Sequence, residues 1–170
     1  SVSYRLQTPH PPGVPIYILI SRLFSLLASE PAQIAFWVNM VSVISSAFTI
    51  LLMFWTITFI GRKILKIAPK ENPSKDQTIK ILGAALIGSL AFTFSDSFWF
   101  NAVEAEVYAM SMFFSAFVYW SMLKWDYYAD EEGSDKWLLL TAYMMGLSLG
   151  VHILNLIMIP GLALIYYFRR

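Results

Sequence analysis

Two long uncharged runs limit what this chain can fold into more than any other feature of its sequence. Residues 32–61 carry no charged side chain over thirty residues, and residues 137–168 carry none over thirty-two, where His152 is the one interruption. Apolar runs of more than about 18 residues are candidates for membrane-spanning helices. Only 14% of the chain is charged, whereas soluble domains carry roughly a quarter. The sequence therefore predicts an all-α integral membrane protein.

Composition excludes several kinds of chemistry. The chain has no cysteine, so disulfides, thiol nucleophiles and cysteine-based metal sites are impossible. Its net charge of +1 and the lack of a basic face interleaved with aromatics indicate no nucleic-acid partner. The motifs of nucleotide-binding loops, zinc proteases and serine hydrolases do not occur. The chain begins with Ser1 and shows no signal-peptide pattern, and we expect it to be a piece of a longer protein.

The distribution of charge predicts a single membrane domain, a polytopic bundle of about five short or tilted spans plus one interfacial helix. Six cations and two acids make the loop at 62–80 cytoplasmic under the positive-inside rule. The last apolar run is expected to turn near His152, although one long kinked helix is the alternative. We expect an external loop and interfacial helix over 1–31, a span over 32–61, the cytoplasmic loop over 62–80, spans over 81–95 and 107–123 joined by an external turn over 96–106, a second cytoplasmic loop over 124–136, and two short spans over 137–168.

Threading the chain through a membrane in this way brings three distant segments together. Residues 1–31, 96–106 and 152–155 all fall on the non-cytoplasmic side, and they contain both histidines and an acidic pair. The cytoplasmic loops contain charge but no comparable mixture of carboxylate, imidazole and amide. The sequence therefore predicts one candidate site on the non-cytoplasmic side.

The acidic pair of this site is Glu104 and Glu106. A carboxylate inside the apolar layer costs at least a few kcal/mol, although both acids could simply mark the water-facing end of a helix hairpin. In a helix, positions i and i+2 point about 200° apart, so the two acids can share a ligand only where the backbone is extended. Placed together, they could bind a divalent cation, act as base and orienting group, or hold sugar hydroxyls.

Five further residues are candidates for binding substrate. His10 lies in a proline-rich loop that is expected to have a defined shape, and Arg5 could meet a phosphate. His152 and Asn155 lie in the predicted turn of the last run, and Tyr108 could stack on a sugar ring. Three of them have a plainer alternative: an unpartnered interfacial imidazole for His10, hydrogen bonds between helices for His152, and a place in the interfacial aromatic belt for Tyr108.

Three blocks of the chain resemble a known family. "HPPGVPIYILISRLFSLL", "SFWFNAVEAEVYAMSMFF" and "GLSLGVHILNLIMIPGLALIYYFRR" occur in the order of successive blocks in a family of multi-pass proteins. This family is common in Bacteroidetes-type bacteria and includes the animal endoplasmic-reticulum O-mannosyltransferase that acts on receptor IPT domains. It belongs to the glycosyltransferase-C superfamily. The resemblance covers nearly the whole chain.

The resemblance implies an enzyme that takes a sugar, such as mannose, from a polyprenyl-phosphate carrier and transfers it to a protein or glycan on the non-cytoplasmic side. The membrane would be a bacterial inner membrane, or that of the endoplasmic reticulum in a eukaryote. Glu104 and Glu106 fall where such enzymes have a second acidic element, which supports the catalytic base. The family's Asp-Cys-Gly-Glu motif is absent, so the main base is expected upstream of Ser1 and this piece alone is expected to be inactive.

Two other classes of function remain open from the residues. A transporter or channel would use intramembrane acids and broken helices as an ion path. A non-catalytic membrane subunit would carry the acids only as markers of the membrane interface.

Overall fold

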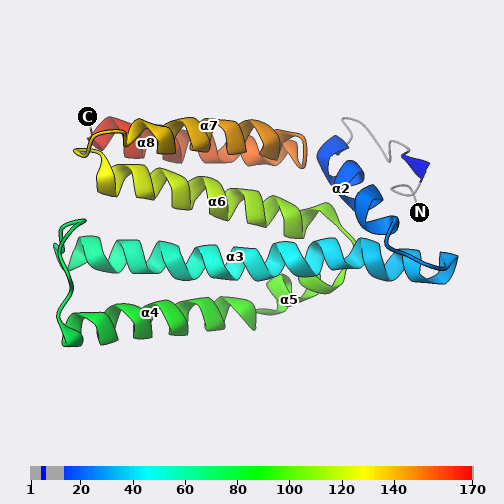
Figure 1. The fold of residues 1–170 in the computed structure, drawn as a ribbon, viewed down its shortest axis with the longest axis horizontal. Coiled ribbons are helices and arrows are strands. Elements are labelled where there is room, and N and C mark those ends of the chain that lie inside the picture. The colour runs from blue at the N-terminus through cyan, green and yellow to red at the C-terminus, as the bar shows by residue number, and fades with distance from the viewer. Residues whose placement is uncertain (1–4, 7–13, 170) are drawn as a thin grey trace.

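The computed structural model describes residues 5–6 and 14–169, and within these ranges the chain consists of helices and the turns that join them, without a strand (Figure 1). The all-α class predicted from the sequence is thereby confirmed. The labelled elements are α2 (Pro15–Ser25), η1 (Pro31–Gln33), α3 (Ile34–Ile64), α4 (Lys75–Thr93), α5 (Asp96–Val103), α6 (Val107–Tyr128), α7 (Asp135–Leu149), η2 (Ile153–Ile157) and α8 (Met158–Arg169).

Helix α3 is the centre of the bundle, with α4 packed on one side of it and α6 on the other (Figure 1). Helices α7 and α8 pack against α6, and α2 packs against α3 near its N-terminal end. The bundle has two ends. The α3–α4 loop, the α6–α7 loop and the C-terminus lie at one end, whereas α2, α5 and the turn between α7 and α8 lie at the other.

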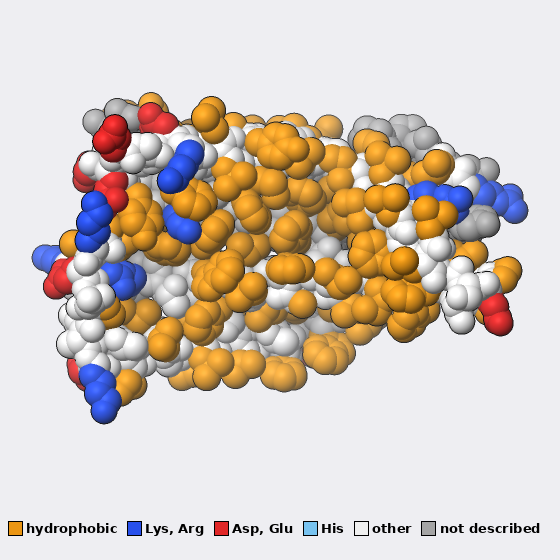
Figure 2. Space-filling view, viewed as in Figure 1, with side chains coloured by type: hydrophobic (Ala, Val, Ile, Leu, Met, Phe, Trp, Pro, Cys, Tyr) orange, Lys and Arg blue, Asp and Glu red, His pale blue; other side chains and the backbone are white. Residues whose placement is uncertain are grey.

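Charged side chains gather at these two ends, and hydrophobic side chains cover the face between them (Figure 2). At the end that holds the α3–α4 loop, Lys63 pairs with Asp126 and Arg169 pairs with Asp130. We call this the charged end, and the opposite one the acidic-pair end, because Glu104 and Glu106 lie there.

The ends of α3 and α4 follow from local sequence. Arg62 and Lys63 lie in the last turn of α3, where cations interact favourably with the helix dipole. Helix α4 begins with a capping box: Ser74 Oγ accepts from the Gln77 N–H at 3.2 Å, and Gln77 Oε1 accepts from the Ser74 N–H at 2.8 Å. The predicted loop at 62–80 is therefore shorter in the structure, running from the end of α3 at Ile64 to Lys75.

The stretch 96–106, predicted as a turn, is mostly helical. Helix α5 occupies Asp96–Val103, and its axis is bent by 66° from that of α4. Phe98 is buried and packs on Phe92 with ring centroids 4.7 Å apart. An eight-residue helix is too short to show much periodicity in its sequence. The contact between Phe98 and Phe92 stabilises α5 more than the helix propensity of its own residues does.

The last apolar run is divided, and α7 ends at Leu149 before α8 begins at Met158. The turn between them is docked against α2. The Ile16 N–H donates to the Gly150 carbonyl at 3.0 Å, and a Cβ on Gly150 would lie 2.7 Å from Ile16 Cδ1. Glycine at this position therefore permits the close approach of α2.

Judged by length and composition, one segment of the described residues, Pro31–Ile64, could cross a membrane. Lys75–Thr93 and Asp96–Val103 pass the same test only as a pair, with the bend between them. The bundle of about five spans stays a prediction.

Candidate functional site

The acidic pair lies on extended backbone between two helices. Glu104 follows α5 with φ −104° and ψ 143°, and Glu106 precedes α6 with φ −126° and ψ 162°. The Glu106 N–H donates to the Glu104 carbonyl at 2.9 Å, which closes a three-residue turn. Glu104 is half-buried and Glu106 is exposed. The backbone of the pair is therefore non-helical, but it turns at Ala105 instead of running as a strand, and a joint role of the two acids stays a prediction.

Helices α2 and α3 form the surroundings of Glu106. Ser42 Oγ of α3 donates to the Glu106 carbonyl at 3.4 Å. Tyr17 of α2 is buried together with Met110 and Val151 in a core cluster, against which Val107 packs. Burial raises the pKa of Tyr17, the nearby Ser21 hydroxyl opposes this rise, and the Glu106 carboxylate adds to it. The phenol thus lies within electrostatic reach of the acidic pair.

Two hydroxyls in this region lack a hydrogen-bond partner. Within the described residues, Tyr17 Oη and Ser21 Oγ are buried without a bond of normal geometry, although they lie near each other. Neither residue was predicted from the sequence. The available signal was their spacing of four residues, which places two polar groups on one face of a mostly apolar helix.

His152 and Tyr108 come together beside the acidic pair. Their ring centroids lie 5.7 Å apart at an interplanar angle of 42°. His152 Nδ1 accepts from the Leu154 N–H at 3.3 Å, which caps η2 and fixes the orientation of the imidazole. Tyr108 is exposed in the first turn of α6, two residues after Glu106. The arrangement puts an aromatic face, an imidazole and a carboxylate at one end of the bundle.

Asn155 is buried and its amide bonds within the bundle. Its Oδ1 accepts from Ser111 Oγ at 2.7 Å and from Ser115 Oγ at 3.4 Å, and its Nδ2 donates to the Ser148 carbonyl at 3.1 Å. These bonds tie η2 to α6 and α7, which is a structural function. Substrate binding by Asn155 stays a prediction.

The remaining candidates are less well placed by the structure. His10 lies outside the described residues, and Arg5 is exposed. In the part of the chain that the structure describes, no group of three or more histidines, aspartates or glutamates could hold a metal ion. A divalent cation at Glu104 and Glu106 therefore stays a hypothesis that rests on two carboxylates alone.

The comparison with family models decides what kind of chain this is. The model of the protein O-mannosyl-transferase TMEM260 N-terminal domain matches residues 1–170, the whole chain. The chain belongs to this family. The comparisons with curated proteins and with solved structures each gave no match. The resemblance to the animal O-mannosyltransferase family is thereby confirmed, whereas membership of the glycosyltransferase-C superfamily and a bacterial origin stay predictions.

As a TMEM260 N-terminal domain, the chain has a role related to mannosyl transfer. Two of the predicted site residues, Tyr108 and His152, are in contact at the end of the bundle that holds the acidic pair. Tyr17 and Ser21 of α2 lie near each other, and Tyr17 is also near Glu106.

Proposed function

We propose that this domain forms part of a membrane glycosyltransferase that transfers mannose from a polyprenyl-phosphate donor to a hydroxyl group of a protein or glycan. The observation that carries the proposal is the extended turn of Glu104 and Glu106 beside the Tyr108–His152 pair. The backbone from Glu104 to Glu106 is non-helical, so the two carboxylates are free of the helical geometry that would point them about 200° apart. Membership of the O-mannosyl-transferase family supports the reaction class.

In the proposed reaction, the acceptor oxygen attacks the anomeric carbon of the sugar. The bond between that carbon and the phosphate oxygen breaks, and polyprenyl phosphate leaves with the bonding electrons. A carboxylate takes the hydroxyl proton as general base. Glu106 orients the acceptor, Glu104 holds sugar hydroxyls or a divalent cation, and Tyr108 stacks on the sugar ring. Arg5, His10 and His152 contact the donor phosphate.

The proposal places the acidic-pair end on the non-cytoplasmic side of a bacterial inner membrane or of the endoplasmic reticulum. The basic loop between α3 and α4 lies at the opposite end of the bundle (Figure 1), and such loops remain cytoplasmic under the positive-inside rule. The apolar segment Pro31–Ile64 supports a membrane setting.

The test is a transfer assay on the full-length protein with polyprenyl-phosphate mannose as donor. We expect Glu104→Gln and Glu106→Gln each to lower kcat by about 100-fold, because misplacement of a reacting group by about 1 Å has an effect of this size. Glu132→Gln is the matched control, since Glu132 is an exposed acid at the charged end.

Two outcomes would refute the proposed roles. Full transfer activity in both glutamine variants would remove the carboxylates from the mechanism and would favour a non-catalytic subunit. Ion flux through reconstituted wild-type protein, abolished by the same two substitutions, would favour a channel. Loss of transfer in the presence of EDTA, restored by a divalent cation, would assign the metal alternative to the pair.

A further inference from the structure

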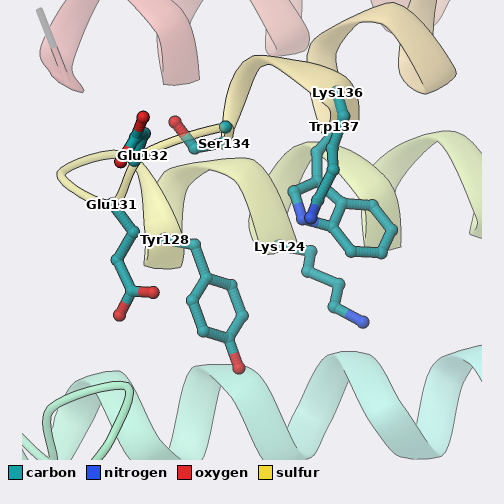
Figure 3. Close-up of a pocket in the computed structure, with 8 residues that line it drawn as sticks. Lys124, Tyr128, Glu131, Glu132, Ser134, Lys136 and Trp137 are labelled. Atoms are coloured by element: carbon teal, nitrogen blue, oxygen red, sulfur yellow. The ribbon is translucent and has the colours of Figure 1, made fainter.

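Two hollows share Trp137, one at the charged end of the bundle and the other nearer its middle. The first, which we call the polar pocket, has a volume of about 200 Å³ and is lined by residues that include Lys124, Glu131, Lys136 and Trp137 (Figure 3). The second, which we call the apolar groove, has a volume of about 370 Å³ and is lined only by apolar side chains of α3, α6 and α7. Trp137 lines both, so the pocket and the groove are neighbours.

Two ammonium groups of the polar pocket lie against aromatic rings. Lys124 Nζ lies 4.2 Å from the centroid of the Trp137 ring system and 4.7 Å from that of Trp120, and Lys136 Nζ lies 5.9 Å from Trp137. Burial lowers the pKa of Lys124, and the nearby charge of Lys136 lowers it further. Both effects disfavour the ammonium form, and an anion between the two lysines would reverse them.

The acids of the polar pocket do not neutralise Lys124. Glu131 Oε2 lies 3.4 Å from Lys70 Nζ and pairs with that lysine. Figure 3 shows the Glu132 side chain directed away from Lys124. Among the salt bridges of residues 5–6 and 14–169, none includes Lys124. The Lys124 side of the pocket is therefore positive and suited to an anion.

The apolar groove has room for part of one hydrocarbon chain. It runs beside α3 from Phe48 to Trp55. These seven steps of about 1.5 Å give about 10 Å of α3. One leaflet of a bilayer is about 15 Å of hydrocarbon, half of the full core, so the groove holds about two thirds of the length of an acyl chain of that leaflet.

We propose that the polar pocket and the apolar groove together bind one glycerophospholipid, with its phosphate between Lys124 and Lys136 and one acyl chain between α3 and α6. Free phosphate would leave the groove empty, and a plain hydrocarbon would leave Lys124 without an anion. Charge and apolarity together therefore select a lipid that has both parts. The polar pocket lies at the end opposite Glu104 and Glu106, and the site is separate from the proposed transfer reaction, although it rests on the proposed membrane setting.

The test is native mass spectrometry of the full-length protein released from detergent micelles after incubation with dioleoyl phosphatidylglycerol. We expect one retained lipid per chain, with an apparent affinity at least about tenfold weaker in Lys124→Gln, because a charge-assisted hydrogen bond is lost. Leu140→Trp is expected to weaken retention by filling the groove that Leu140 lines. Lys75→Gln is the matched control, since Lys75 is an exposed lysine at the same end.

Three results would overturn the proposal. Dioleoylglycerol, which has the same chains without phosphate, must bind more weakly, and equal retention would remove the role of the lysines. Displacement of the lipid by inorganic phosphate alone would indicate an anion site without a lipid chain. Retention unchanged in Lys124→Gln, Lys136→Gln and Leu140→Trp, all with wild-type helical circular dichroism, would place the lipid elsewhere. Mannosyl transfer measured on the same variants separates this site from the reaction, because it depends on the opposite end.

Discussion

The buried hydroxyl of Tyr17 lowers the stability of the fold and lies near the candidate site. It is buried at 6% exposure, and among the described residues neither it nor the nearby buried Ser21 hydroxyl has a hydrogen bond of normal geometry. A buried hydroxyl without a partner costs about 1–3 kcal/mol. Since the phenol lies near the Glu106 carboxylate, this destabilising group is located at the candidate site.

The substitution Tyr17→Phe is expected to stabilise the domain by about 1 kcal/mol, because it removes the unsatisfied hydroxyl and keeps the buried ring. This corresponds to a rise in Tm of about 2–4 °C for a domain of this size. Thermal unfolding in detergent, followed by circular dichroism, measures it. Tyr143→Phe is the control, since Tyr143 is 64% exposed, and we expect no change there. A lower Tm in Tyr17→Phe would mean that the hydroxyl has a partner, such as an ordered water.

At the scale of single elements, the two serine N-caps of the α4–α5 unit differ. Ser74 forms both bonds of a capping box with Gln77. Ser95 precedes α5 without any side-chain cap bond and donates instead to the Phe92 carbonyl at 2.8 Å. Helix α4 therefore depends on its cap, whereas α5 depends on the burial of Phe98.

We expect Ser74→Ala to destabilise the first turn of α4 by about 1 kcal/mol, the usual effect of removing an N-cap. Amide hydrogen exchange in residues 75–78 should rise about fivefold, while exchange at the centre of α4 stays unchanged. Ser95→Ala is the matched substitution, and its effect on the first turn of α5 should be smaller. Equal effects at the two positions would contradict the capping box as the source of stability.

The sequence predicts the position of a helix where the residues of that helix themselves mark its extent and its ends. The predicted span at 32–61 corresponds to α3 at Ile34–Ile64, since its uncharged run and its terminal cations are local features. Helix α5 was missed, because its eight residues carry no periodicity and its bend of 66° from α4 depends on packing. Similarly, a turn of the last run near His152 was predicted, but the docking of Gly150 to Ile16 was not.

At the scale of the whole molecule, the predicted sidedness depends on which loops and turns lie at each of the two ends of the bundle. The α3–α4 and α6–α7 loops lie at the charged end, whereas α5 and the α7–α8 turn lie at the acidic-pair end (Figure 1). Salt bridges between Lys63 and Asp126 and between Arg169 and Asp130 hold the charged end together. The two ends must face opposite sides if the bundle crosses a membrane.

Single cysteines test this arrangement, because the chain has none of its own. We expect cysteines at Ser74 and Gly133 to react with a membrane-impermeant thiol reagent from the cytoplasmic side only. A cysteine at Ser97, which is exposed in α5, should react from the other side only. Labelling of positions 74 and 97 from the same side would contradict the topology that unites the candidate site.

What the sequence by itself determined is the helical class and the backbone condition on the acidic pair. Long uncharged runs predict helices because such runs must satisfy their backbone hydrogen bonds internally. The spacing of Glu104 and Glu106 requires a non-helical backbone for a shared ligand, and the structure has one. Both conclusions follow from neighbouring residues and need no knowledge of packing.

Only the tertiary structure decided which residues stand beside the pair. Tyr17 reaches Glu106 across more than eighty residues of chain, and Tyr108 meets His152 across more than forty. The bonds of Asn155 to α6 and α7, like the contact of Lys124 with Trp137, depend on how the helices are rotated against one another. No local pattern encodes that rotation, because it is set by the packing of side chains from several helices at once.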